Sequence, residues 1–130
     1  QQAAACGMLF ELADDVTSDS SADDIETAVA RRFTANPPDA IITGSTTGAI
    51  AAIAGAESAG KMIGQDVDAV SKEAIRLLHR FRKELIVVHE DVGRAGNFLA
   101  RAVIAAIEGR APDEGQGLEI PQLSDFHTGQ

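Results

Sequence analysis

Apolar residues recur along the chain with two different spacings, and their alternation predicts an order of strands and helices. Short β-branched runs bounded by Pro or Gly are typical of strands in a parallel sheet. Apolar positions three or four residues apart over longer stretches predict helices. Strands are predicted at Ala40–Thr43, Val67–Val70, Leu85–Val88 and Leu118–Pro121. Helices are predicted from Ser21 to about Thr34, over Ala49–Ala59, within Ser71–Glu84 and over Gly93–Glu108.

Capping and turn residues set the predicted boundaries. Ser21 stands where a helix N-cap is expected, because carboxylates follow it in the first turn. Pro37 must end that helix, and Gly60 is expected to end the next one. The first residues, Gln1–Leu12, are expected to be the last turns of a helix, and Val16–Thr17 a short edge strand.

This order of elements predicts an α/β fold. Strands that alternate with helices of this length imply βαβ units with right-handed crossovers and a mainly parallel sheet. We therefore expect a three-layer α/β/α lobe over residues 1–121 and a loose tail over residues 122–130. Ligands of such sheets bind at the carboxyl ends of the strands. The segments after Thr17, Thr43, Val70 and Val88 are thus the places to look for a site.

Composition restricts the partners that this segment can bind by itself. The chain has 130 residues, with 20 acidic and 11 basic side chains, and a formal charge of −9. No apolar run approaches the roughly 20 residues of a membrane helix. A strongly negative surface repels nucleic-acid phosphates, so we expect no direct DNA contact and no membrane contact. The single Cys6 cannot form an internal disulfide, which fits a reducing compartment.

Two charged runs have simple interpretations. Glu11–Glu26 contains seven carboxylates and no basic residue, which is typical of a solvated surface. Five of the basic residues lie within residues 72–83 and are interpreted as a solvated helix face, able to pair with acidic residues of a neighbouring chain. The start, Gln1–Ala5, has neither an initiator Met nor a targeting signal, so we expect it to be the cut end of a longer polypeptide.

The loop Gly44–Gly48 is the strongest candidate for ligand binding. It links a predicted strand to a predicted helix, where free backbone N–H groups and hydroxyls can bind hydroxyl-bearing or anionic ligands. Its sequence, Gly-Ser-Thr-Thr-Gly, is neither a Walker A loop nor a nucleophile elbow. The alternative is that Ser45 or Thr46 only caps the helix that follows.

The two later strand ends offer weaker candidates. Glu73 follows the predicted strand Val67–Val70 and can accept hydrogen bonds from vicinal hydroxyls of a ligand. A surface ion pair between Glu73 and Lys72 is the simpler interpretation. His89, Glu90 and Asp91 follow the next strand, but successive side chains alternate in direction and do not converge readily on one metal ion. No nucleophile is paired with a general base, so we expect no enzyme activity, no cofactor and no metal.

The order of these motifs resembles the C-terminal lobe of the effector-binding domain in the lac repressor (LacI/GalR) family of transcription regulators. The resemblance covers about residues 20 to 121 and rests on Pro38–Ala49, Ala59–Gly60, Ile63–Val67, Val88–Gly93 and Ala106–Gly109. It implies a lobe of the type I periplasmic-binding-protein kind, without its first strand and the start of its first helix. It also implies a small sugar-like effector, a homodimer, a cytoplasmic location and operator binding only through a helix-turn-helix headpiece that is not in this chain.

The resemblance also assigns candidate effector-binding residues. Ser45 and Thr46 stand where the family has Asn-Asp, and Ser20 where many members have an aromatic residue that stacks on the ligand. Glu73 stands at the position of an effector-binding Asp, and Glu90 at that of a Gln. Without the aromatic residue and with two longer carboxylates, the site is expected to prefer a more polar, hydroxyl-rich or cationic ligand. The implied dimer interface lies near the helix after Gly48 and around residues 74–83.

Two other classes of protein stay open. A solute-binding protein of the same lobe type would deliver its ligand to a transporter, and a signal peptide upstream would indicate it. An enzyme of doubly wound fold would use the Gly44–Gly48 loop for phosphate, and a phosphate-dependent thermal shift would indicate that.

Overall fold

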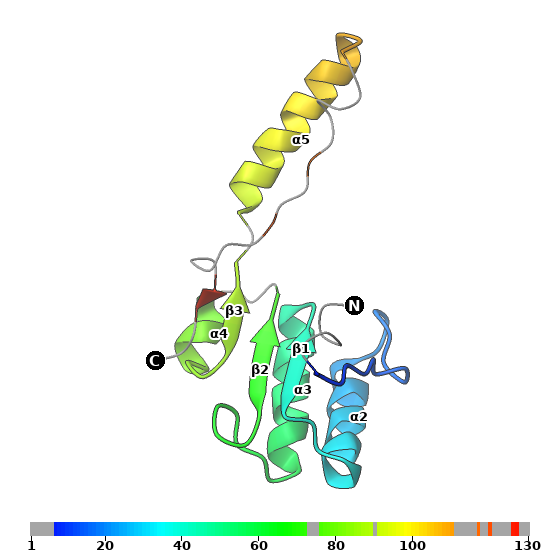
Figure 1. The fold of residues 1–130 in the computed structure, drawn as a ribbon, viewed down its shortest axis with the longest axis vertical. Helices are drawn as coiled ribbons and strands as arrows, with labels where there is room; N and C mark the ends of the chain where they lie inside the picture. Colours follow the sequence, from blue (N-terminus) through cyan, green and yellow to red (C-terminus); the bar gives the residue numbers. More distant parts are fainter. Residues whose placement is uncertain are drawn as a thin grey trace.

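The computed structural model describes residues 7–72, 76–89, 91–110, 117, 120 and 126–127 of the chain (Figure 1). In chain order, the described elements are α2 (Ala22–Ala35), β1 (Ala40–Thr43), α3 (Thr46–Ser58), β2 (Asp68–Ser71), α4 (Arg76–Phe81), β3 (Ile86–Val88), α5 (Val92–Ile107) and β4 (Phe126–His127). None of the described helices is both long and apolar enough to cross a membrane.

The sheet has the order β1-β2-β3-β4. The first three strands are parallel, and β4 runs antiparallel to β3. The predicted α/β class with a mainly parallel sheet is therefore confirmed. Residues 126–127, which form β4, fall in the segment that we expected to be a loose tail.

Burial alternates along the strands, so the two faces of the sheet differ. On one face, Ala69 and Val87 are buried and Ile41 packs against the hydrophobic core. On the other face, the strand register places Ile42, Val70 and Ile86 in one row, and Ile42 is 66% exposed. Fully buried strands were expected, but within the described residues helices cover only one face.

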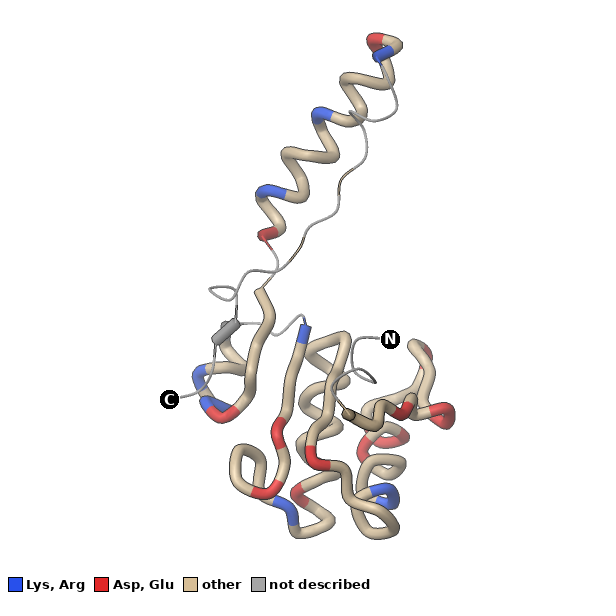
Figure 2. Tube along the Cα trace, viewed as in Figure 1, with Lys and Arg blue, Asp and Glu red and all other residues tan. Residues whose placement is uncertain are grey.

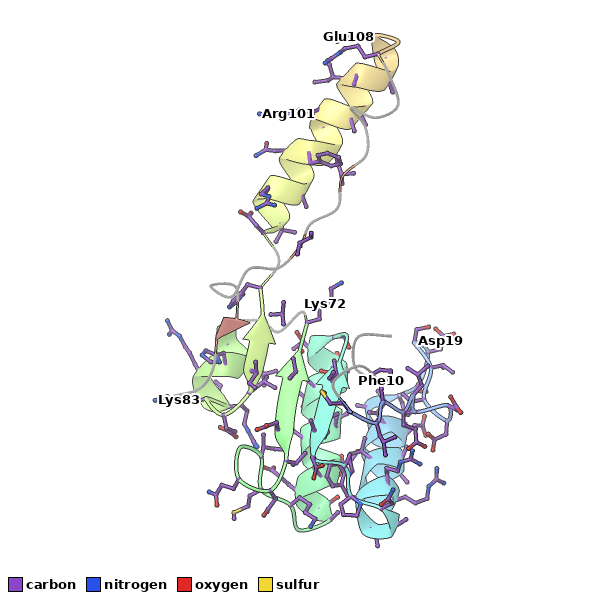
Figure 3. The ribbon with its side chains drawn as sticks, in the orientation of Figure 1. Phe10, Asp19, Lys72, Lys83, Arg101 and Glu108 are labelled. Carbon is purple, nitrogen blue, oxygen red and sulfur yellow. The ribbon has the colours of Figure 1, made fainter. Side chains whose placement is uncertain are left out.

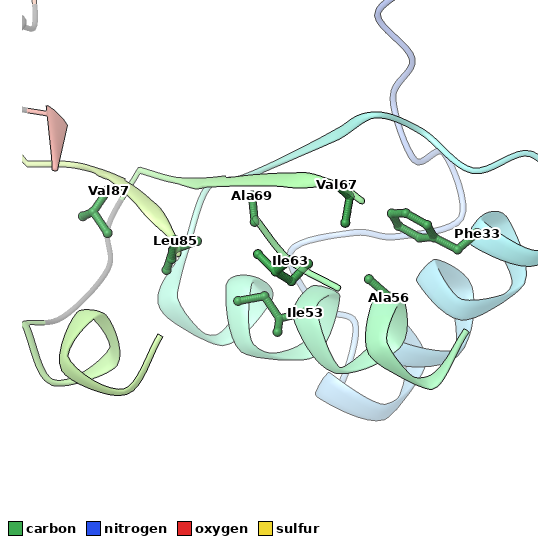
Figure 4. Close-up of a cluster of buried hydrophobic side chains, with 8 residues drawn as sticks. All are labelled: Phe33, Ile53, Ala56, Ile63, Val67, Ala69, Leu85 and Val87. Atoms are coloured by element: carbon green, nitrogen blue, oxygen red, sulfur yellow. The ribbon is translucent and has the colours of Figure 1, made fainter. Parts of the chain in front are cut away.

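The core lies between that face and the helices (Figure 4). Its buried side chains come from α2, α3, the strands and the segments that precede them: Phe33, Ile53, Ala56, Ile63, Val67, Ala69, Leu85 and Val87. Leu78 of α4 packs against the same cluster. The arrangement is consistent with an α/β/α lobe in which α2, α3 and α4 form one helical layer.

A glycine allows α2 and α3 to approach closely. A Cβ atom on Gly55 would lie 2.5 Å from the carbonyl oxygen of Glu26 and 2.9 Å from Cβ of Val29. Such a distance is shorter than any ordinary contact, so only glycine fits at this crossing. The small residues of α3 therefore set the spacing of the helical layer.

Helix α5 has a different environment. It extends away from the sheet and from the other helices (Figure 1). The main packing contacts between described elements join α2, α3 and the strands, and none of them involves α5. Of the residues of α5, Ala105 is buried, whereas Val92, Leu99 and Ile107 are exposed.

Two predicted helix starts can be compared with the structure. Ser21 is the N-cap of α2: the N–H of Asp24 donates to Ser21 Oγ at 3.2 Å, and the Ser21 hydroxyl donates to Asp24 Oδ2 at 2.7 Å. This prediction is confirmed. Helix α3 begins at Thr46, three residues before the predicted Ala49, because Ser45 caps it.

Other predicted elements are wrong or fall outside the described residues. Val16–Thr17 is not a strand, because turns surround it: the N–H of Val16 donates to Ala13 and that of Ser20 to Thr17. Residues 7–12 are not helical, and residues 1–6 are not described. Of the predicted strand Leu118–Pro121, only Ile120 is described, and it is not in a strand.

Candidate functional site

The carboxyl ends of β1, β2 and β3 lie at one edge of the sheet because these strands are parallel. Helix α3 begins at the same edge, immediately after β1 (Figure 1). The polar residues that the structure gathers here are Thr43, Ser45, Thr46, Ser71 and Lys72. We call this group the carboxyl edge.

Ser45 has the capping role that was the alternative to ligand binding. Its Oγ accepts a hydrogen bond from the N–H of Gly48 at 3.1 Å. The side chain is nevertheless exposed, and a hydroxyl that accepts one hydrogen bond can still donate one. Thr46, half-buried, is the first residue of α3, so both residues lie at the positive end of that helix dipole.

Ser71, at the end of β2, is the most unusual polar residue of the carboxyl edge. It is 0% exposed, and its Oγ has no hydrogen-bond partner among the described residues. The register pairs it with Thr43, whose Oγ1 donates to the carbonyl of Val70 at 3.3 Å. An unpaired buried hydroxyl costs about 1–3 kcal/mol. Stability alone does not account for a serine at this position.

Sequence reasoning did not select Ser71 as a site residue. The available signal was its place at the end of a strand, two residues after Ala69, which puts both on one face. That signal does not tell which face is covered by helices. The missing information was the packing of α3 under β1 and β2.

Lys72 gives the carboxyl edge a positive charge. Its backbone N–H donates to the carbonyl of Thr43 at 3.0 Å, which fixes the chain as it leaves β2. The residue is exposed and lies at the same edge of the sheet as the start of α3 (Figure 3). A lysine and a helix N-terminus both favour ligands with negative or electron-rich oxygens.

The other predicted site residues have different positions. Ser20 lies in the loop before α2, half-buried, and its Oγ accepts from the N–H of Thr17 at 2.9 Å. No described hydrogen bond links it to Ser45 or Thr46. Glu73 and Glu90 lie outside the described residues. The structure therefore brings Ser45 and Thr46 together and leaves the rest of the predicted set untested.

The basic segment after β2 is not a uniform solvated face. Arg82 Nη1 donates to Glu57 Oε2 at 3.2 Å, and its Nε lies 2.6 Å from Oε1 of Glu84. The hydrogen bond with Arg82 lowers the pKa of the Glu57 carboxyl and raises that of the guanidinium. Arg82 thus joins the end of α3 to the segment before β3, whereas Lys83 is exposed (Figure 3).

Within the described part of the chain, no group of three His, Cys, Asp or Glu side chains is placed to hold a metal ion. The described part of the chain is an α/β lobe that has hydroxyl groups, a lysine and a helix N-terminus at the carboxyl ends of its parallel strands. No family model matches the chain, and no curated protein matches it significantly.

Proposed function

We propose that this chain is an effector-binding lobe of a cytoplasmic bacterial transcription regulator of the lac repressor type. It binds a small polar ligand, such as a sugar or polyol, at the carboxyl edge and catalyses no reaction. Operator DNA is contacted by a helix-turn-helix headpiece elsewhere in the protein. The observation that carries the proposal is the buried, unpartnered Ser71 hydroxyl beside the N-terminal end of α3.

The chemistry of the carboxyl edge supports a hydroxyl-rich ligand. A ligand hydroxyl can both donate and accept, so it can accept from the exposed Ser45 hydroxyl. Ser71 is 0% exposed, so a ligand hydroxyl supplies the partner that Ser71 lacks only if the end of β2 or the start of α3 shifts and uncovers it. Lys72 and the first amides of α3 add donors for a further ligand oxygen. The ligand would thereby recover the hydrogen-bond energy that the unliganded lobe forgoes.

Regulation then requires two states that bind the ligand differently. A ligand held between this lobe and a second lobe shifts the equilibrium towards the closed state only by its difference in affinity for the two states. The closed state would hold the headpieces in a different arrangement on the operator.

The test uses the protein encoded by the complete reading frame and a panel of sugars and polyols. The readouts are ligand affinity by calorimetry and ligand-dependent operator release. Ser71→Ala and Ser45→Gly should each weaken the best ligand about 3- to 10-fold, the equivalent of one hydrogen bond of about 0.5–1.5 kcal/mol. Glycine is used at position 45 because it keeps most of the capping energy.

Ser58→Ala is the matched control, because Ser58 is at the far end of α3, where its hydroxyl donates to the carbonyl of Gly55 at 2.9 Å. It should leave ligand affinity unchanged. If Ser71→Ala and Ser45→Gly also leave affinity and operator release unchanged, the carboxyl edge is not the effector site. Binding without any operator response would instead favour a solute-binding protein.

A further inference from the structure

Helix α5 presents a stripe of exposed apolar side chains. Val92, Leu99, Val103 and Ile107 are spaced seven, four and four residues apart and are between 59% and 81% exposed. This spacing puts them on one side of an α-helix. We call them the α5 stripe. Its length, from the first to the last residue of α5, is about 24 Å at 1.5 Å per residue.

The other side of α5 has different neighbours and a different chemistry. Phe98 lies against Gly117, where an added Cβ would come within 2.9 Å of the ring, and Ala105 is buried. Arg94 and Arg101, seven residues apart, lie on the side of the helix away from the stripe. Within the described part of the chain, the α5 stripe therefore lacks a packing partner.

The sheet has a short apolar row that no described helix covers, in which Ile42 is exposed and Val70 and Ile86 are half-buried. Ile42, Val70 and Ile86 form a row across β1, β2 and β3 on the face away from α3. We call this row the open face. The only charged residue within these three strands is Asp68, which is exposed, lies two residues before Val70 and so stands on the open face at the amino end of β2. A helix with an uncharged stripe can pack on the row of Ile42, Val70 and Ile86 without burying a charge only if it leaves Asp68 at its margin.

The charges of the chain favour contact between α5 and the body of a second copy. Helix α5 contains Arg94 and Arg101, and its caps Asp91 and Glu108 are carboxylates, so with Arg110 the segment 91–110 carries a net charge of +1 within a chain of net charge −9. The carboxylates lie mainly on the body that holds the sheet (Figure 2). Two such bodies repel each other, whereas α5 of one copy is attracted to the body of the other.

We propose that α5 is exchanged between two copies of this chain, so that the α5 stripe of each copy packs on the open face of the other. Each copy then supplies one helix and one acceptor face, and the exchange closes a two-fold dimer. The exchanged helix supplies the second helical layer of the α/β/α lobe. This interface differs from the predicted one near α3 and residues 74–83.

Cross-linking tests which copy provides the helix. In a Cys6→Ser background, one preparation carries Ile42→Cys and a second carries Val103→Cys, and the two are unfolded, mixed and refolded together. A short bis-maleimide should then link the two variants into a heterodimer. As a control, Leu77→Cys replaces Ile42→Cys, because Leu77 is an exposed apolar residue of α4 on the alternative interface. A cross-link from Val103→Cys to Leu77→Cys but not to Ile42→Cys would overturn the proposal.

The double variant Ile42→Cys/Val103→Cys separates exchange from packing within one chain. Exchange predicts a covalent dimer, whereas a monomer with an internal link would show that α5 folds back on its own sheet, contrary to the proposal. Light scattering gives a second readout on the unmodified chain. Leu99→Asp should weaken dimerisation at least about tenfold, because it buries an unpaired charge.

Asn97→Asp adds the same charge to α5 away from the stripe and is the control for Leu99→Asp. It should leave the dimer intact. Equal dissociation by both variants, or a monomeric unmodified chain at concentrations up to about 1 mM, would contradict the exchange. None of these readouts uses a ligand, so they are independent of the proposed effector site.

Discussion

Helices α3 and α5 are both rich in alanine and isoleucine, yet only α3 is buried. The buried residues of α3 cover more than half of its circumference and are Ala49, Ala51, Ala52, Ile53, Gly55 and Ala56. Ile50, at 51% exposed, and Glu57 lie on its remaining side. In α5 the exposed residues Val92, Leu99, Val103 and Ile107 form one stripe, and Phe98 and Ile104 lie off it. A helix with a wide buried arc fits against two surfaces, whereas a striped helix needs one.

The comparison shows which part of the chain holds the fold together. Helix α3 contacts α2 on one side and the strands on the other, so a change there affects both layers. Helix α5 has no comparable contact within the described residues. Matched substitutions in the two regions should therefore differ strongly in their effect on stability.

Phenylalanine removal should give the largest difference. Phe33 of α2 is 4% exposed and belongs to the core, whereas Phe98 of α5 is 36% exposed. Phe33→Ala should lower the free energy of unfolding by about 3–5 kcal/mol, because it leaves a cavity beside Ala56 and Val67. Phe98→Ala should cost less than about 1.5 kcal/mol. Urea denaturation of both variants measures this, and equal costs would contradict the division into two regions.

Glycine replacement should give effects of opposite sign. Gly55→Ala places a Cβ against Glu26 and Val29 and should destabilise by about 1–3 kcal/mol through overpacking. Gly96→Ala in α5 meets no atom within 4 Å and should stabilise that helix by about 0.5–1 kcal/mol. Thermal unfolding and helix content by circular dichroism distinguish the two. A neutral Gly55→Ala would show that α2 can move away from α3.

Much of the fold was predictable because its boundaries are local. Pro37 and Gly60 mark the ends of helices, and Ser21 begins one, whatever the rest of the chain does. The run Ala40–Thr43 was correctly predicted as a strand for the same reason. Val16–Thr17 was wrong because two β-branched residues do not make a strand without a neighbour to pair with.

The site and the position of α5 depend on non-local information. Ser45 was found because its loop has a recognisable composition. Ser71 was missed because its burial follows from which face of β2 meets α3. In the same way, the α5 periodicity predicts a stripe but does not say which surface covers it. Which face is covered depends on which strands pair and which surfaces pack together, and the residue pattern of one sequence does not specify either.

Removal of an N-cap residue should lower the global free energy of unfolding in α3 but affect only local opening in α5. Ser45 caps α3, and Asp91 caps α5 by accepting from the N–H of Arg94 at 2.9 Å. Ser45→Ala should lower the free energy of unfolding by about 1 kcal/mol, because α3 unfolds with the core. Asp91→Ala should leave the global value unchanged and speed hydrogen exchange only in the first turns of α5. Faster exchange throughout the sheet in Asp91→Ala would contradict the comparison.

The smallest effect is expected from the ion pair at the end of α3. Arg82 lowers the pKa of Glu57 in the folded protein below its ordinary value of 4.5. The pair therefore contributes stability above that pH and loses it as the pH falls through the lower, folded-state pKa. Glu57 is 44% exposed, so we expect a contribution of less than about 1 kcal/mol. Glu57→Gln should lower stability at pH 7 by that amount, and its stability should converge with that of the unmodified chain once the pH has fallen below the folded-state pKa of Glu57.

The control for this ion pair lies in α5. Arg101→Gln removes a charge from an exposed position outside the core, so its unfolding curve should run parallel to that of the unmodified chain between pH 3 and pH 7. Urea midpoints measured across this range test both variants. If Arg101→Gln changed the acid limb as much as Glu57→Gln, the pH dependence would reflect the net charge of the chain. A change of the acid limb in Glu57→Gln alone would locate the pH dependence of stability in the contact between α3 and the segment before β3. Global stability depends on this region.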